Sequence, residues 1–156
     1  MDSELRRQLL DTWAIHGRII LFVLGSVDPA ALAAADIKGR SAGNQFAHLH
    51  NVRLMWLQAA MPERLQGLEK LDAGQAADPS RLSQALDASG KAIADLLGRG
   101  LDSGKIKGFK PHPIAFLGYL IAHESYHQGD IGVRLTQAGH PLSQKASYGM
   151  WEWGSR

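Results

Sequence analysis

Two histidines and a glutamate within five residues are the side chains with the clearest chemical potential in this sequence. They lie in the stretch AHESYHQGD, residues 122–130, where His123, Glu124 and His127 form a His-Glu-x-x-His pattern. On a helix, side chains four residues apart share one face, so both imidazoles can bind one metal ion. The same pattern occurs in zinc peptidases, in which the glutamate is the general base. It therefore raises metal-dependent hydrolysis as a first hypothesis.

A peptidase also needs a third ligand and a sheet edge that binds the substrate. In the extended zincin pattern a glycine and a third histidine follow the pair, but this chain has Asp130 and Val133 at those positions. The only downstream glutamate is Glu152, in a short C-terminal tail. Alternating strand patterns are nearly absent, so no substrate-binding sheet edge is expected. The hydrolase hypothesis then depends on Glu124 alone.

A candidate third ligand lies upstream, in the stretch NQFAHLHNVRLMWL at residues 44–57. His48 shares a helical face with Val52 and Met55, whereas His50 lies about 200° away around the same helix. His48 is therefore the better candidate ligand. His50 is expected to be a solvated or interhelical polar residue.

Four long segments with hydrophobic residues at intervals of three and four must position these side chains. They predict helices over residues 3–26, about 41–60, from 79 to the glycines at 98 and 100, and from 113 to about 138. Asp28, Ser41 and Asp78 precede helical starts as N-cap candidates, and a further short helical turn is expected within residues 28–36. The expected fold class is all-α, a four-helix bundle with long variable connections, and residues 1–156 are expected to form a single domain.

The last long helix presents its histidines on an apolar face. At about 100° per residue, His123 and His127 lie about 40° apart, and Phe116, Leu120 and Ile131 fall in the same sector. The imidazoles are therefore expected to point into the bundle. Buried imidazoles need partners, and a shared metal ion would supply one.

Two acidic residues near the histidines are candidate catalytic residues. Glu124 lies about 60° beyond His127, at the edge of the apolar face, and can act as a base only if the first helix leaves room. Asp130 lies about 20° from His123. Three roles are open to it: it reaches the metal site, it fixes the tautomer of a ligand histidine, or it is a solvated or interhelical salt-bridging acid. His16, on the apolar face of the first helix, is expected to be a core residue with one hydrogen bond.

Composition excludes several functional classes. The 156 residues include no cysteine, which excludes disulfides, cysteine-ligated metals and a protein thiol nucleophile. The net charge is only +2 and the basic residues are dispersed, so nucleic-acid binding is not expected. The most apolar run, IILFVLGSV, is far shorter than the roughly 20 residues of a membrane-spanning helix. No secretory leader is evident, so a cytoplasmic location is expected. Trp151 and Trp153 are expected to pack rather than to form a substrate box.

The stretches FAHLHNVRLMWL, YLIAHESYHQGDI and YGMWEWG together resemble the DinB/YfiT-like metal-binding four-helix bundles over nearly the whole chain. The resemblance implies that His48, His123 and His127 form a facial triad for a divalent metal, with zinc or nickel as first candidates and manganese or iron as the next. It also implies a homodimer and a transferase-type enzyme that acts with a low-molecular-weight thiol, such as bacillithiol or mycothiol, on a small-molecule substrate. Many members have His-x-Gly-Gln where this chain has His127-Gln128-Gly129-Asp130, a difference in the surroundings of the ligands.

An open coordination sphere would follow from this ligand set. Three neutral imidazoles leave one or more positions for water or substrate. An ion held in this way lowers the pKa of bound water to about 7 or binds a substrate thiol as thiolate. Because many relatives have no known activity, a non-catalytic, stress-related metal-binding module remains the alternative to an enzyme.

Overall fold

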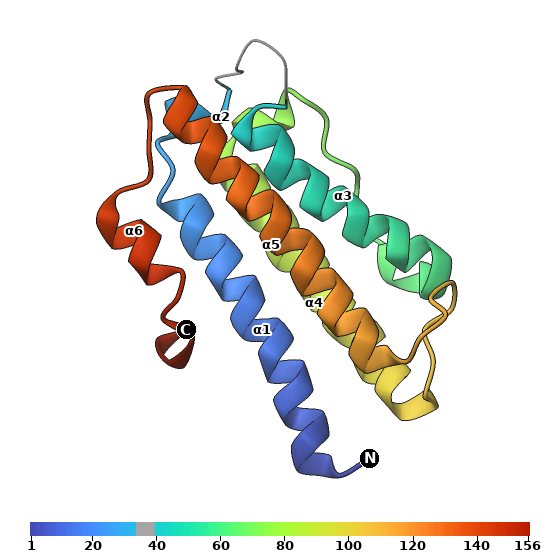
Figure 1. The fold of residues 1–156 in the computed structure, drawn as a ribbon. Helices are drawn as coiled ribbons and strands as arrows, with labels where there is room; N and C mark the ends of the chain where they lie inside the picture. Colours follow the sequence, from blue (N-terminus) through green and yellow to red (C-terminus); the bar gives the residue numbers. More distant parts are fainter. Residues whose placement is uncertain (34–39) are drawn as a thin grey trace.

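The computed structural model describes residues 1–33 and 40–156, and all its long elements are helices (Figure 1). The long helices are α1 (Ser3–Gly25), α3 (Ala42–Ala60), α4 (Pro79–Ser103) and α5 (Pro113–Gln137). The short ones are α2 (Pro29–Leu32), α6 (Gln144–Gly149) and the 3-10 helices η1 (Pro62–Leu65), η2 (Gln75–Ala77) and η3 (Trp153–Ser155). Within the described ranges no strand occurs, which confirms the all-α prediction. No helix in this part of the chain combines the length and apolarity needed to cross a membrane.

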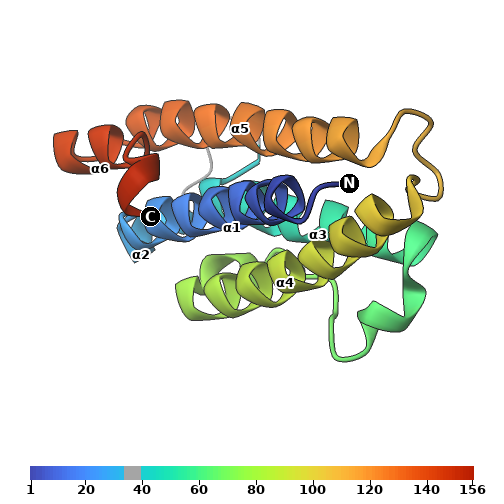
Figure 2. The same cartoon turned by 90° about the horizontal axis from the view of Figure 1, so that it is seen from below.

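The four long helices form a bundle in which neighbours in space are not always neighbours in sequence. α1 packs against α4 and α5, and α3 packs against α4 and α5. Helices α1 and α5 run in one direction and α3 and α4 in the other (Figures 1 and 2). Residues 61–78 return the chain to the start of the bundle, so that α3 and α4 can run in parallel. Helix α6 lies outside the bundle, beside α1 and α5 (Figure 2).

Polar side chains begin the helices where the sequence predicts. Asp28, Ser41 and Asp78 accept hydrogen bonds from the backbone of the first turns of α2, α3 and α4, as N-caps do. His112 caps α5, because its Nδ1 accepts from the backbone N–H of Ala115 at 3.2 Å. The part of the predicted turn at residues 34–36 lies outside the described residues.

Helix α4 is longer than predicted at its C-terminal end. It does not stop at Gly98 and Gly100 but continues to Ser103. A Cβ atom at Gly100 would lie 2.2 Å from Cδ1 of Ile106, so this glycine allows the following loop to pack closely on the helix. The helix ends at Gly104, whose φ of 77° is the left-handed conformation that glycine adopts readily.

A polar layer divides the core of the bundle into two apolar halves. One half surrounds Phe46 and lies toward α2, and the other surrounds Phe116 at the opposite end. The layer takes one buried polar residue from each long helix: His16, Arg53, Ser89 and Glu124. Helix α3 buries two further polar residues, Gln45 and His50. Buried polar groups must bond to one another, so this layer fixes how the four helices align.

Candidate metal centre

The three predicted ligands meet on the side of the bundle where α3 packs against α5. His48 comes from α3, and His123 and His127 come from α5. One ligand atom of each side chain lies within 4.8 Å of the other two. The ring centroids are 5.5 Å apart for His48 and His123, 4.5 Å for His48 and His127, and 4.7 Å for His123 and His127. The three histidines could therefore hold one metal ion.

The histidines are half-buried, so the prediction that they point into the bundle is wrong. At about 100° per residue, the buried residues of α5, which include Leu120 and Ile131, centre about 80° from His123. Glu124 lies about 100° from His123, so it is closer to that centre than either histidine is, and it is 1% exposed. Glu124 therefore occupies the inward position, and the histidines lie at the edge of the buried face, where a small molecule can approach them.

Their surroundings keep the three imidazoles neutral. Burial, with the charges of His127, Arg40 and His123, lowers the pKa of His48 to about 4. Burial also lowers the pKa of His123. The pKa of His127 is lowered by burial, then by the charges of His123 and Arg40. A neutral imidazole has a lone pair on one ring nitrogen, which is the form that binds a metal ion.

Gln45 and Asp130 fix the orientation of His127. Nδ1 of His127 lies 2.7 Å from Oε1 of Gln45. Nε2 of Gln45 donates to Oδ2 of Asp130, which also accepts from Nε of Arg134 at 2.8 Å. Because the amide nitrogen of Gln45 donates, its oxygen accepts, so His127 donates from Nδ1 and keeps its lone pair on Nε2. Asp130 thus forms a salt bridge, within α5 rather than between helices, and also contacts His127 indirectly through Gln45.

His123 carries the observation that best fits a bound ion. Its Nδ1 is buried and has no hydrogen-bond partner within the described residues, although buried polar atoms are normally paired. A cation bound by the cluster through Nδ1 of His123 would supply that partner. A tetrahedral zinc ion, with bonds of about 2.0–2.1 Å, holds its ligand nitrogens about 3.3 Å apart. Ligand atoms that already lie within 4.8 Å need only small side-chain rotations to reach that spacing.

Both carboxylate oxygens of Glu124 are engaged inside the bundle. Oε1 accepts from Nε of Arg53 at 2.7 Å, and Oε2 accepts from Nη2 of Arg53 at 2.8 Å and from Nε2 of His16 at 2.9 Å. Burial raises the pKa of Glu124, but the charge and hydrogen bonds of Arg53 and the bond from His16 outweigh it and lower the pKa to about 2. A carboxylate with these bonds is a poor proton acceptor near neutral pH. The geometry therefore favours a structural role.

The remaining histidines of the helices have structural partners. His16 is buried with the one hydrogen bond that was predicted. His50 is 1% exposed, and its ring nitrogens lie 3.0 Å from the carbonyl oxygen of Ala85 and 2.8 Å from that of Glu69. Burial lowers the pKa of His50, although both carbonyls act in the opposite direction. His50 is thus an interhelical residue and not a solvated one.

Sequence reasoning missed Gln45 and Arg53, whose side chains hold candidate site residues in place. Arg53 is 1% exposed and also donates to the backbone carbonyl of Leu86 at 2.8 Å. The burial of Arg53 could have been predicted, because Arg53 lies seven residues after Phe46 and so on the same buried face of the helix. A cation at such a position indicates a buried anion on another helix.

A sequence model of the DinB family matches residues 1–152, which include the whole bundle and all three histidines. No curated protein and no solved structure gives a significant match.

Proposed function

The chain belongs to the DinB family, and from this premise we propose that it is a divalent-metal protein whose ion is bound by His48, His123 and His127. The observation that carries the proposal is the meeting of three neutral imidazoles, from two helices, within 4.8 Å. Imidazole ligands suit zinc, nickel and iron alike. The family resemblance makes zinc or nickel the first candidates and manganese or iron the next. Three protein ligands leave positions open for water or substrate, as in catalytic sites.

The residues around the histidine cluster fix the ring of His127 on one side, through Gln45, and form an exposed aromatic surface on the other, through Tyr119 and Tyr126. Gln45 holds the ring of His127 in one tautomer, as described above. Tyr119 stacks on His123, and Tyr126 meets His127 edge-on at a centroid distance of 5.2 Å. The two tyrosines are 37% and 73% exposed, so they form an exposed aromatic rim beside the histidines. Aromatic rims of this kind offer flat apolar contacts to an approaching molecule.

We extend the proposal to a transferase-type reaction in which a low-molecular-weight thiol is one substrate. A metal ion in the cluster would favour the thiolate form of that substrate at neutral pH, which makes it a stronger nucleophile. The positive charge of Arg40 acts on both His48 and His127. The same charge would attract an anionic thiolate or carboxylate to the open side of the site. The homodimer that the family resemblance implies stays a prediction.

The hydrolase alternative has little support from the geometry. It depended on Glu124 as general base, and Glu124 is enclosed by Arg53 and His16 within the core. The alternative of a metal-binding module without turnover shares every feature of the triad. Only a measurement of turnover separates it from an enzyme.

The test is the metal dependence of thiol consumption by the purified chain. Bacillithiol, mycothiol and glutathione are each offered with monochlorobimane as the electrophile, and the conjugate is followed by fluorescence. The proposal expects metal-dependent turnover with at least one thiol, its loss in His127→Ala, and its retention in His140→Ala, which changes a 40% exposed side chain outside the cluster. Equal rates for metal-loaded and chelator-treated protein would contradict the transferase. Firm metal binding without turnover for any thiol would favour the non-catalytic module.

A further inference from the structure

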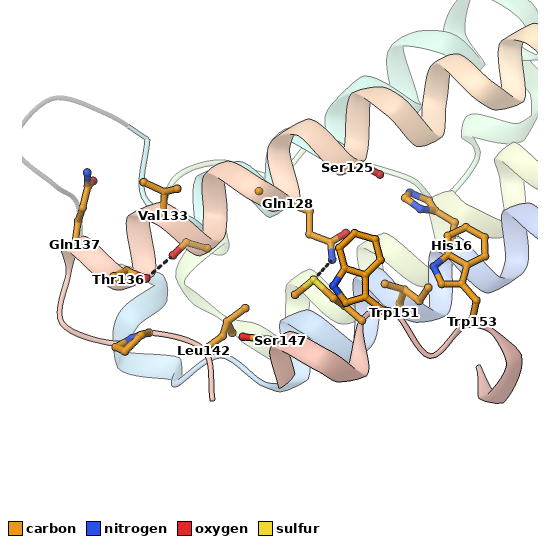
Figure 3. A pocket seen from close by; sticks show the side chains of 15 residues that line it. His16, Ser125, Gln128, Val133, Thr136, Gln137, Leu142, Ser147, Trp151 and Trp153 are labelled. Carbon is orange, nitrogen blue, oxygen red and sulfur yellow. Dashed lines mark hydrogen bonds between the residues drawn. The ribbon is translucent and has the colours of Figure 1, made fainter. Parts of the chain in front are cut away.

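A cavity of about 690 Å³ lies on the opposite side of α5 from the histidine cluster. Three segments line it: α1, the C-terminal half of α5, and the residues from Pro141 to Trp153 (Figure 3). On α5, Ser125, Gly129 and Gly132 line the cavity, and they lie about 120–180° around the helix from the two histidines. The cavity is therefore separate from the candidate metal centre.

Its wall on α5 carries little side-chain bulk. A Cβ atom built at Gly129 or at Gly132 would meet no atom within 4 Å. Glycine in a helix interior costs roughly 0.5–1 kcal/mol relative to alanine, and no neighbour requires glycine at either position. The two glycines thus leave space along the helix that larger residues would fill.

The lining is partly aromatic, and its one titratable side chain is the imidazole of His16. No Lys, Arg, Asp or Glu is among the lining residues. Trp151 is 76% exposed and Trp153 is 36% exposed, so the prediction that both are packing residues is wrong for Trp151 at least. Both tryptophans line the cavity together with Gln128 (Figure 3). Hydroxyl and amide groups from Ser125, Gln128 and other residues supply the polar atoms of the lining.

We propose that this cavity binds an uncharged, aromatic small molecule, at a site distinct from the metal centre. Its volume lies within the roughly 300–1,000 Å³ of small-molecule sites, and such sites combine apolar walls with a few polar groups. An ionised ligand would lose hydration without meeting a Lys, Arg, Asp or Glu side chain, and Nε2 of His16 is already hydrogen-bonded to Glu124. Enclosure by three segments suits a molecule of limited size better than the flat surface of a second chain. The inference does not depend on the proposed metal chemistry.

The experiment uses the full chain and N-phenyl-1-naphthylamine, an uncharged aromatic probe that fluoresces in apolar surroundings. The test variant is Gly132→Leu, which places a side chain in the cavity. The matched control is Gly118→Leu on the same helix, where a Cβ also meets no atom within 4 Å but the residue does not line the cavity. The proposal expects saturable binding to the wild type, an affinity lower by about tenfold or more in Gly132→Leu, and no change in Gly118→Leu.

Three results would overturn the proposal: no saturable binding to the wild type, equal weakening in both variants, or tighter binding of the anionic 8-anilinonaphthalene-1-sulfonate than of the neutral probe. The mass of each variant in solution is measured in parallel. A wild-type dimer that becomes a monomer only in Gly132→Leu would show that a second copy occupies the cavity, which also overturns it. If Gly132→Leu does not fold, Trp151→Ala takes its place, and unchanged affinity in that exposed-site variant would be contrary to the proposal.

Discussion

Replacement of Arg53 by methionine probes the polar layer at the centre of the bundle. Arg53 and Glu124 are each 1% exposed, and their contact is bidentate, at 2.7 and 2.8 Å. Arg53→Met removes the cation but leaves the carboxylate buried with only the bond from His16. Removal of one partner of a buried ion pair costs about 3–5 kcal/mol. For a chain of this length that corresponds to a fall in melting temperature of roughly 6–20 °C.

The assay is urea-induced unfolding of the wild type, Arg53→Met, Glu124→Gln and the double variant. Because the two side chains bind each other, the double variant should be less destabilised than the sum of the single variants, by about 1–3 kcal/mol. Lys91→Ala is the control. It breaks an exposed pair with Asp87, at 2.6 Å and one helical turn away, and should change the free energy of unfolding by no more than about 0.5 kcal/mol.

The same variants address the role of Glu124 in function. If the role of Glu124 is structural, the Arg53→Met/Glu124→Gln double variant, once folded at room temperature, should keep its metal content and its turnover. A free energy of unfolding in Arg53→Met within about 1 kcal/mol of the wild type, or additive effects in the cycle, would refute the reasoning about the polar layer. A fully folded Glu124→Gln that binds metal normally but has no turnover would restore Glu124 as a candidate base.

Three further predictions concern single side chains. Gln45→Leu removes the acceptor that orients a ligand imidazole and should weaken metal affinity about 10–100-fold in a chelator competition, with the fold unchanged by circular dichroism. His50→Phe removes the one N–H that the neutral imidazole can donate to the carbonyl oxygen of Ala85 or Glu69, and it should lower the free energy of unfolding in urea by about 1–3 kcal/mol, while metal content stays the same. Gly100→Ala places a Cβ atom against Ile106 and should destabilise the chain by about 1–3 kcal/mol, whereas Gly118→Ala, in open space, should stabilise it slightly.

The local periodicity of the sequence was sufficient to predict the helices and the helical faces on which the candidate ligands lie. The spacing of His123 and His127 places them one turn apart in any helix, and His48 was distinguished from His50 by its helical face. The caps at Ser41 and Asp78 were predictable for the same reason, since they depend on neighbours within one turn.

Contacts between distant segments were not predictable from local patterns. Arg53 and Glu124 are 71 residues apart, and His16 and Glu124 are 108 apart. The position of Arg53 on a buried face indicates that it needs an anion, but no local pattern identifies Glu124 as that partner. The inward position of Glu124 depends on how α5 is rotated against its neighbours, a difference of some tens of degrees that the helical pattern did not resolve. Gly100 was misinterpreted as a helix end because its packing partner belongs to the following loop.

The most direct test of the central claim is the metal content of the purified chain, together with the coordination of the ion. We predict one divalent ion per chain, coordinated by three imidazole nitrogens and at least one water, by X-ray absorption. His48→Ala or His127→Ala should abolish stoichiometric binding, while His140→Ala should retain it. Full occupancy in both ligand variants, or an ion coordinated without imidazole, would show that these histidines do not bind the metal.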